Sequence, residues 1–384
     1  MARNLLLLAL LFFALVSSRS FSWTPSPKPA AAAPPPESPS PATALFVLGD
    51  SSVNCGDNTF FYPVLPVNFS SPFCDRSRHR LLPDLIAARM GLPPPRPFYS
   101  LNGSAAAAAA RGVNFGSTPA TILSAVGGGG GGGGGFVFMF QTLSQQVRQV
   151  FETLQLVQLL SGPAAARHLA SSALFLLSFG ADDYARLLSP ASDPAALPPM
   201  YGRRGFARLL ASQMIRAVQD LYDADVRRVA VVGVGPLGCA PRVVWEGARG
   251  SDGRDCVDEV NELIQGYNAK LAARLTSLRS QLPEAEIVFC DVYKAVTEII
   301  SNPSVYGFEN VRDACCGFGR FGGMIGCLAG EMACTEPEKH VWWDFYSTSD
   351  AVNAILANWL WSPSPGPGIS ICQPISLQQL AGAE

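Results

Sequence analysis

Histidine and charged residues are scarce in this chain. Only three of its 384 residues are histidine, and aspartate, glutamate, lysine and arginine together make up 15% of it, with a formal net charge of −2. No run of basic residues is present that could neutralise a phosphate backbone, so nucleic acid is not an expected partner. No P-loop or G-x-G-x-x-G spacing joins a strand to a helix, and no paired C-x-x-C spacing occurs, so we expect neither an organic cofactor nor a metal centre.

Long hydrophobic runs are equally scarce. The run at residues 5–16 follows Arg3 and precedes a serine-rich stretch, which is typical of a secretory signal peptide over residues 1–20. A signal anchor is the alternative, although the run is shorter than a membrane span usually needs. No later segment is long and apolar enough to cross a bilayer, so we expect a soluble, secreted protein. Residues 21–43 are rich in proline, alanine and serine and are expected to form an extended leader.

Cysteine, by contrast, is plentiful. In an oxidising compartment most of the ten cysteines are expected to form disulfides, whose connectivity the sequence leaves open. A zinc site built from the last cluster of four is the alternative, although no histidine joins that cluster. The short spacings favour Cys239 with Cys256, and Cys315 and Cys316 with Cys327 and Cys334.

Short β-rich runs alternate with helical patterns from residue 44 onward. Strands are expected at residues 44–48, 112–115, 173–179, 229–234 and 286–291, and helices at 82–90, 141–160, 206–222, 257–282 and 350–361. This alternation predicts the α/β class, as a three-layer α/β/α sandwich around a five-stranded parallel sheet. We place this domain at residues 44–375, with a glycine run at 127–135 expected to be a disordered loop. Sequons at Asn68 and Asn102 predict glycosylation, which fits secretion.

The first expected strand ends abruptly at Gly49-Asp50-Ser51. A serine at this position lies at the carboxyl edge of a parallel sheet, where α/β folds form their ligand crevice, and it can present a nucleophilic hydroxyl. It can equally cap the helix that follows. The choice between a nucleophile and a cap therefore depends on the rest of the chain.

Further turn segments carry a consistent series of motifs. In chain order these are Gly49-Asp50-Ser51-Ser52, Gly112-Val113-Asn114-Phe115-Gly116-Ser117, Gly180-Ala181-Asp182-Asp183-Tyr184, Gly235-Pro236-Leu237-Gly238-Cys239-Ala240-Pro241, Asp313-Ala314-Cys315-Cys316-Gly317 and Trp342-Trp343-Asp344-Phe345-Tyr346-Ser347-Thr348. The series resembles the consecutive blocks of the plant GDSL esterase/lipase family, of the SGNH hydrolase superfamily, over roughly residues 44–372. The resemblance implies the flavodoxin-like sandwich of that superfamily, an acyl ester of lipid or cell-wall type as the ligand, and a location in the apoplast.

The resemblance also implies acyl transfer by a serine nucleophile, a histidine base and an aspartate that orients the base. Carried over by position, the nucleophile is Ser51 and the orienting acid is Asp344. The histidine position is occupied by Ser347, whose hydroxyl cannot take a proton from another serine near neutral pH. A substitute base would have to be His340 or His79, and we interpret His340 as a surface or packing residue.

The oxyanion hole implied by the resemblance combines the serine amide, a glycine amide and an asparagine side chain. Ser51 keeps the first donor, but Thr118 stands in place of the glycine and Asp182 in place of the asparagine. A carboxylate accepts hydrogen bonds and repels a developing negative charge, unless a neighbour such as Asp183 keeps it protonated. Losing the base of a serine triad costs roughly six orders of magnitude in turnover, and losing an oxyanion donor costs roughly two to three when the effects are independent.

Three functions are compatible with these residues. The sequence favours a secreted GDSL-type protein that binds an acyl ester and whose hydrolysis is absent or vestigial. The second is a working carboxylic ester hydrolase with a rearranged base. The third is a non-catalytic binding or structural protein of the apoplast.

Overall fold

The computed structural model describes residues 41–54, 79–101, 109–123, 141–188, 202–247, 256–327, 330–362 and 370–383. The expected signal peptide, the leader up to residue 40, the sequons at Asn68 and Asn102 and the glycine run at 127–135 lie outside these residues. Within them, no helix is long and apolar enough to cross a bilayer.

A mostly parallel sheet forms the centre of the domain. Its seven strands run in the order β11-β8-β7-β6-β1-β3-β2. Their bounds are β1 Leu45–Gly49, β2 Arg96–Pro97, β3 Val113–Asn114, β6 Leu174–Ser178, β7 Arg228–Val232, β8 Glu286–Cys290 and β11 Cys372–Gln373. The five strands expected from the sequence are all present and parallel, and two short strands extend the edges, β2 parallel to β3 and β11 antiparallel to β8.

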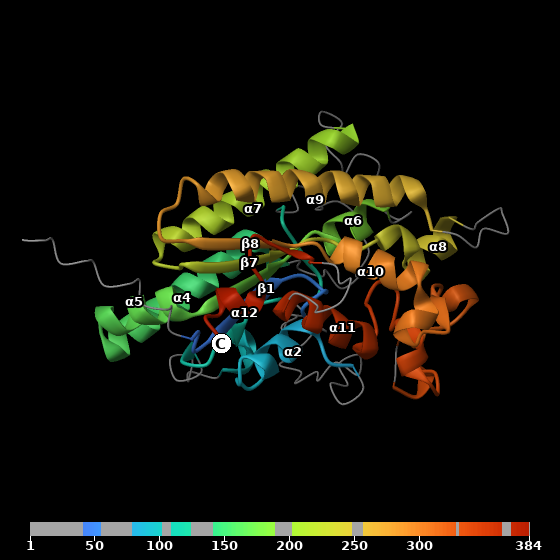
Figure 1. Cartoon of the computed structure of the whole chain (residues 1–384), viewed down its shortest axis with the longest axis horizontal. Helices are drawn as coiled ribbons and strands as arrows, with labels where there is room; N and C mark the ends of the chain where they lie inside the picture. Colours follow the sequence, from blue (N-terminus) through green and yellow to red (C-terminus); the bar gives the residue numbers. More distant parts are fainter. Residues whose placement is uncertain are drawn as a thin grey trace, which may run out of the picture. The chain divides into compact units, whose positions relative to one another are not determined.

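Helices cover both faces of this sheet, which confirms the three-layer architecture. Phe46 and Leu48 of β1 pack toward α4, α5, α7 and α9, whereas Leu45 and Val47 pack toward α2, α10, α11 and α12. Figure 1 shows α7 and α9 on one side of the sheet and α2, α11 and α12 on the other. These helices are α2 Leu82–Arg89, α4 Leu143–Ser161, α5 Pro163–Ser172, α7 Gly202–Asp223, α9 Asp258–Arg279, α10 Val292–Ser301, α11 Asp350–Trp361 and α12 Leu377–Leu380. Because both faces are buried, the strands read as continuous apolar runs rather than as alternating ones.

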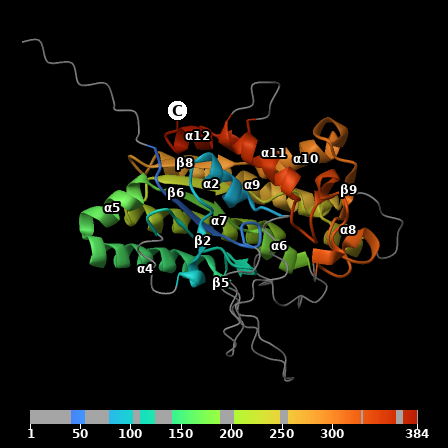
Figure 2. The same ribbon diagram turned by 90° about the horizontal axis from the view of Figure 1, so that it is seen from below.

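The remaining elements are short. They are α6 Ala181–Leu188, α8 Pro241–Gly247, the strand pair β4 Ala120–Thr121 and β5 Gln141–Thr142, and the pair β9 Asn310–Ala314 and β10 His340–Trp342. On the face covered by α2, α11 lies beside α2, and α10 lies beside α11 (Figure 2).

Strand register brings the carboxyl ends of the central strands into one row. Gly49 of β1 pairs with Ser178 of β6, which pairs with Val232 of β7, which in turn pairs with Cys290 of β8. The chain leaves β1 for β3 on one side and later returns to β6 on the other side. This change of direction is the switch point at which doubly wound sheets form their ligand crevice. The crevice therefore opens beside the turn that follows β1.

Four disulfides join the described cysteines. They are Cys239–Cys256, Cys290–Cys372, Cys315–Cys334 and Cys316–Cys327. The first pair is the expected one, and the last two resolve the order that the sequence left open. The Cys290–Cys372 bridge, which the spacing did not suggest, joins the antiparallel edge strand β11 to β8.

Candidate active site

The end of β1 is fixed by a side chain from α4. Gln146 is fully buried, its Oε1 accepts from the Gly49 amide at 2.8 Å, and its Nε2 donates to the Gly49 carbonyl at 2.8 Å. Residue 49 must be a glycine, because a Cβ would lie 2.2 Å from a Val53 methyl and 2.5 Å from the Ser178 carbonyl oxygen. The direction of the chain is thus set before it reaches Ser51. Sequence reasoning missed Gln146, because its contact spans 97 residues of chain.

Asp50 joins the turn after β1 to the start of α6. Its buried carboxylate accepts from the Ser52 amide at 3.0 Å, the Gly180 amide at 2.9 Å and the Asp182 amide at 3.3 Å. Burial raises the pKa of Asp50, and these hydrogen bonds oppose that rise. Asp50 therefore holds Ser51 and Asp182 at a fixed spacing.

Ser51 directs both its hydroxyl and its amide at one side chain. The hydroxyl donates to Asp182 Oδ1, and the amide donates to Asp182 Oδ2 at 3.2 Å. Oδ2 also accepts from the Ala120 amide at 2.9 Å. Two backbone N–H groups that converge on one oxygen are the arrangement by which an oxyanion hole binds its substrate. Here the Asp182 carboxylate occupies those donors.

The carboxyls of α6 have raised pKa values. Burial and the negative charge of Asp50 raise the pKa of Asp182 to about 8, against the hydrogen bonds from Ser51 and Ala120. The charged neighbour that raises the pKa of Asp182 is Asp50, and not Asp183, the neighbour named from the sequence. Asp183 turns to a different partner: it accepts from the Ile122 amide at 2.9 Å, and burial raises its own pKa to about 7.

Thr118, which stands in the expected glycine position, lies in the turn that places the Ala120 amide beside Asp182. The Thr118 hydroxyl donates to the Asn54 carbonyl, and the peptide bond to Pro119 is cis. The amide that reaches Asp182 comes from Ala120, two residues beyond Thr118. The sequence carries no signal for this donor, because the path of the turn between β3 and β4 decides which amide points inward.

Ser347 lines the same cavity as Ser51, whereas Asp344 is hydrogen-bonded to backbone amides of its own turn. Asp344 Oδ1 accepts from the Tyr346 amide at 3.0 Å and from the Ser347 amide at 2.8 Å. Ser51 and Ser347 both line the cavity at the carboxyl end of the sheet. The structure thus brings the nucleophile position and the substituted base position together, and Asp344 caps the turn that presents Ser347.

His79 reaches this cavity from the segment that precedes α2. It is buried, its ring stacks on Trp343 with centroids 5.2 Å apart, and its Nε2–H donates to the Thr348 carbonyl at 2.8 Å. The next residue, Arg80, holds the segment in place through its backbone amide and guanidinium on the Asp350 carboxylate. Among the described residues, no histidine is hydrogen-bonded to Ser51, although His79 lines the same cavity.

The cavity beside Ser51 is mainly apolar and has a volume of about 100 Å³. Its lining includes four serines, Ser51, Ser52, Ser178 and Ser347, and the hydroxyls of Ser52 and Ser178 are hydrogen-bonded at 2.7 Å. Its walls are aliphatic side chains from β7, α10 and α11 and the loop after β7: Val232, Val234, Leu237, Val292, Val296 and Leu356. The arrangement suits a ligand with a polar end beside Ser51 and an apolar chain.

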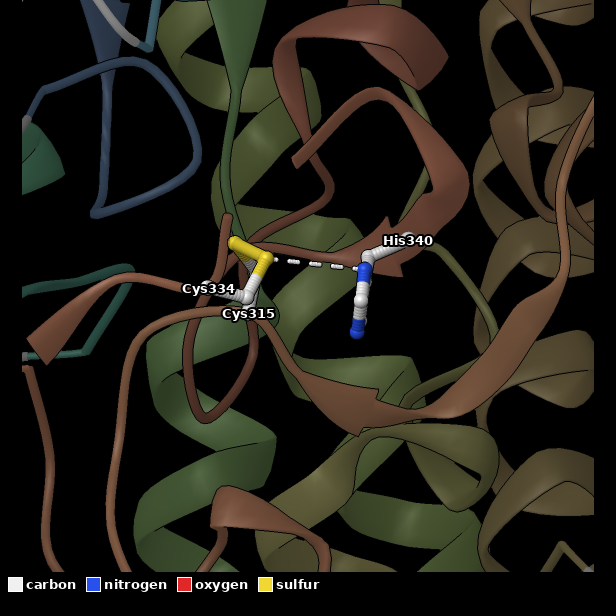
Figure 3. A group of neighbouring side chains, drawn as sticks. All are labelled: Cys315, Cys334 and His340. Carbon is white, nitrogen blue, oxygen red and sulfur yellow. Dashed lines mark hydrogen bonds between the residues drawn. A yellow bond between two sulfur atoms is a disulfide. The ribbon is translucent and has the colours of Figure 1, made fainter. Parts of the chain in front are cut away.

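His340 belongs to a different cluster. Its Nδ1 lies 3.5 Å from Cys334 Sγ and 3.2 Å from the Glu336 carbonyl oxygen, as Figure 3 shows for the sulfur contact. The three residues Cys315, Cys334 and His340 are close enough to surround a metal ion. However, Cys315 and Cys334 form a disulfide, so neither sulfur is a thiolate ligand, and the zinc alternative for these cysteines is wrong. His340 packs against this disulfide, as expected for a packing residue.

Comparisons with known proteins agree with this geometry. Residues 45–360 match the model of the family described as GDSL-like lipase/acylhydrolase. The chain is 33% identical to GDSL esterase/lipase At1g71250 of Arabidopsis thaliana over 350 residues, and this alignment covers 88% of each protein. It is also 29% identical to GDSL esterase/lipase At1g71691 and to GDSL esterase/lipase 7 of the same plant, over 88% of this chain and 85% and 92% of theirs. This chain therefore belongs to the GDSL-like lipase/acylhydrolase family, whose members are acyl ester hydrolases.

Proposed function

We propose that this chain is a secreted GDSL-family protein that binds an acyl ester beside Ser51 and hydrolyses it at most vestigially. The proposal rests on one observation: the Asp182 carboxylate accepts hydrogen bonds from the Ser51 hydroxyl, the Ser51 amide and the Ala120 amide. The Asp182 carboxyl competes with the substrate oxygen for these donors, and above its pKa of about 8 its charge also repels the charge that develops on that oxygen. The substitution of Ser347 for the base acts in the same direction.

The magnitudes indicate a severe impairment. Removing the base of a serine triad costs about six orders of magnitude in turnover, equivalent to about 8 kcal/mol of barrier. Removing an oxyanion donor costs about two to three orders of magnitude on its own. What remains is the contribution of binding and positioning, which keeps an ester close to Ser51 without activating the hydroxyl strongly.

The proposed ligand is an acyl ester of lipid or cell-wall type. Its chain would lie along the aliphatic walls formed by Val234, Val296 and Leu356, with the ester group beside Ser51. Ala181, at the start of α6, lines this cavity and is half-buried, so Ala181→Phe narrows it without overfilling the core. We expect Ala181→Phe to weaken the binding of an acyl ester at least tenfold, measured by its displacement of a bound fluorescent fatty acid. Ala164→Phe, at an exposed position of α5, is the matched control.

Secretion is supported by the apolar run at residues 5–16 and by the four disulfides, which persist in oxidising compartments. The apoplast is the corresponding location, since the relatives are plant proteins. Expression of the full chain with a C-terminal tag in plant cells tests this part. Recovery of the tag only inside the cells would reject it, and the N-terminal sequence of secreted protein would locate the cleavage site.

Hydrolysis is tested with short p-nitrophenyl esters. We expect turnover many orders of magnitude below that of an intact serine triad, and no more than slightly above that of Ser51→Ala. Turnover of tens per second that disappears in Ser51→Ala would reject the proposed impairment. Failure to bind acyl ligands at all would reject the binding role and favour a structural one.

A second candidate function is efficient hydrolysis with His79 as the base. It is favoured by one observation: His79 lines the cavity that contains Ser51, and Trp343 and Thr348 hold its ring. With Nε2–H on a carbonyl, the neutral ring would offer Nδ1 as its acceptor. This function requires that His79→Gln removes Ser51-dependent turnover, whereas His168→Gln, at an exposed position of α5, leaves it unchanged.

A further inference from the structure

The substitution that removes an expected oxyanion donor also gives Ser51 a proton acceptor. The Ser51 hydroxyl donates to Asp182 Oδ1, so the carboxylate is in direct contact with the proton that a nucleophilic serine must lose. Hydrogen-bond contact between nucleophile and base is the first geometric requirement for general base catalysis. Asp182 meets it, whereas no described histidine is hydrogen-bonded to Ser51.

We propose that Asp182 is the general base for Ser51 and that the residual hydrolysis by this chain passes through a Ser51–Asp182 dyad. The inference rests on the proposed function, since it concerns the slow reaction that remains at the same site. It assigns Asp182 the task that the family gives to a histidine, whose position in this chain is occupied by Ser347.

Asp182 is held in one orientation by groups from three segments. Its Oδ2 accepts from the Ser51 amide and from the Ala120 amide, and its own backbone amide donates to Asp50. These contacts leave Oδ1 on the hydroxyl of Ser51. A base whose second oxygen is anchored by two amides keeps its place without a third residue to orient it.

The charged and titratable neighbours of Asp182 make it a stronger base than an ordinary carboxylate. Asp50 acts on it from the turn after β1, and Asp183 follows it on α6. Burial, Glu246 and, to a smaller extent, Asp182 raise the pKa of the nearby Tyr346. Burial and Asp50 raise the pKa of Asp182 to about 8. An ordinary aspartate has a pKa of about 3.9 and would be far too weak to take the proton of an alcohol. The ionised fraction of Asp182 therefore rises with pH through about 8.

The chemical steps balance with these groups alone. Ser51 Oγ forms a bond to the ester carbonyl carbon while its proton moves to Asp182 Oδ1, and the carbonyl electrons move onto the ester oxygen. Collapse of this intermediate breaks the bond to the alkoxy group, which takes the proton from Asp182 and departs as the alcohol. A water molecule then attacks acyl-Ser51, gives its proton to Asp182, and the proton returns to Ser51 Oγ as the carboxylic acid leaves.

The same geometry explains why this reaction is slow. Asp182 Oδ2 occupies the two backbone donors, so the oxygen of the intermediate gains little from them. A positioned general base contributes about two to four orders of magnitude, which is less than the loss of the family base and hole together. Residual turnover and impairment therefore have one structural cause.

The test measures labelling by a fluorophosphonate and hydrolysis of p-nitrophenyl butyrate between pH 6 and 9.5, with Ser51→Ala as the blank. We expect the Ser51-dependent rate of the unaltered chain to rise with a midpoint near pH 8. Asp182→Asn should lower it at least about 100-fold. His168→Gln, at an exposed position of α5, should leave both the rate and the midpoint unchanged. Thermal unfolding of each variant identifies loss of fold.

A second variant keeps the inference testable if Asp182→Asn does not fold. Asp50→Asn removes the charge that raises the pKa of Asp182, so the midpoint should move to lower pH, which a merely structural role would not produce. An Asp182→Asn rate equal to or above that of the unaltered chain would overturn the inference, as would loss of the rate in His79→Gln or no detectable Ser51-dependent reaction. The proposed function fails separately, if the unaltered chain turns over esters as fast as an intact triad.

Discussion

The effect of Asp182→Asn should change sign when an imidazole is returned to position 347. In the unaltered chain this substitution removes the proton acceptor of Ser51 and lowers the Ser51-dependent rate. In Ser347→His the base comes from the imidazole, and Asp182→Asn then replaces a repelling carboxylate with an amide that can donate to the oxyanion. The two substitutions thus couple through Ser51, although one lies on α6 and the other in the segment between β10 and α11.

The structure has room and orientation for this imidazole. Ser347 lines the cavity of about 100 Å³ that also contains Ser51. Asp344 Oδ1 is engaged by the Tyr346 and Ser347 amides, and no hydrogen bond within the described chain engages Oδ2, which can accept the Nδ1–H of a histidine at 347. The orienting acid is therefore already in place beside the substituted position.

The expected magnitudes follow from the two roles. Asp182→Asn should lower the rate about 100-fold alone and raise it about 100- to 1000-fold in Ser347→His. The combined change of about 10⁴ or more corresponds to a coupling free energy of about 5.5 kcal/mol. Initial rates on p-nitrophenyl butyrate at pH 9, where Asp182 with its pKa of about 8 is mostly ionised, measure it, with Ser51→Ala in each background as the blank.

An Asp182→Asn effect of the same sign in both backgrounds would refute the reasoning. A decrease in both would mean that an amide at 182 does not rebuild the hole, as expected if the turn at Thr118 and Pro119 has removed its other donor. An increase in both would mean that Asp182 only blocks the site and takes no proton.

Three further predictions concern stability. Gln146→Leu leaves the backbone amide and carbonyl at the end of β1 buried and unpaired, so it should lower the free energy of unfolding in urea by about 2–5 kcal/mol, whereas Gln155→Leu on the exposed face of α4 should change it little. Removing the Cys290–Cys372 bridge, which closes a separation of 82 residues, should lower it by about 4–5 kcal/mol, and an unchanged denaturation midpoint would show that β11 holds without it. The pKa of Asp183 is raised to about 7, so between about pH 4 and pH 7 this residue keeps its proton in the folded chain while an unfolded aspartate has lost it. The free energy of unfolding should therefore fall by up to about 1.4 kcal/mol per pH unit as the pH rises from about 4 to 7. Asp183→Asn should flatten this slope in melting curves recorded across that range.

The parts of the fold that the sequence predicts are those with a strong local pattern. The central strands, such as residues 173–179, are continuous apolar runs, and helices such as α9 carry a long amphipathic repeat. The edge strands β2 and β11 have two residues each and no pattern of their own. They form because a neighbouring strand end and, for β11, a disulfide place them there, which are tertiary causes that a local reading does not contain.

The features of the site also divide into those that local motifs predict and those that depend on the folded chain. The positions of Ser51, Asp182 and Ser347 follow from ordered motifs, and the structure brings Ser51 to each of the other two. Two things did not follow from the motifs: that Asp182 would turn its carboxylate onto the nucleophile, and that His79 would enter the same cavity. Both depend on contacts across more than 100 residues, Ser51 to Asp182 and His79 to Thr348, which only the folded chain makes.

The two substitutions at this site are better understood together than singly. With an imidazole at position 347, a carboxylate at 182 would only cost rate, because it would repel the charge that the hole must stabilise. Without that imidazole, Asp182 is the one described group that accepts a hydrogen bond from the Ser51 hydroxyl, and its burial beside Asp50 gives it the proton affinity of a useful base. The chemistry of Ser51 therefore depends on which position, 347 or 182, holds its proton acceptor. An acceptor at position 182 keeps the proton transfer but loses the stabilisation of the developing charge.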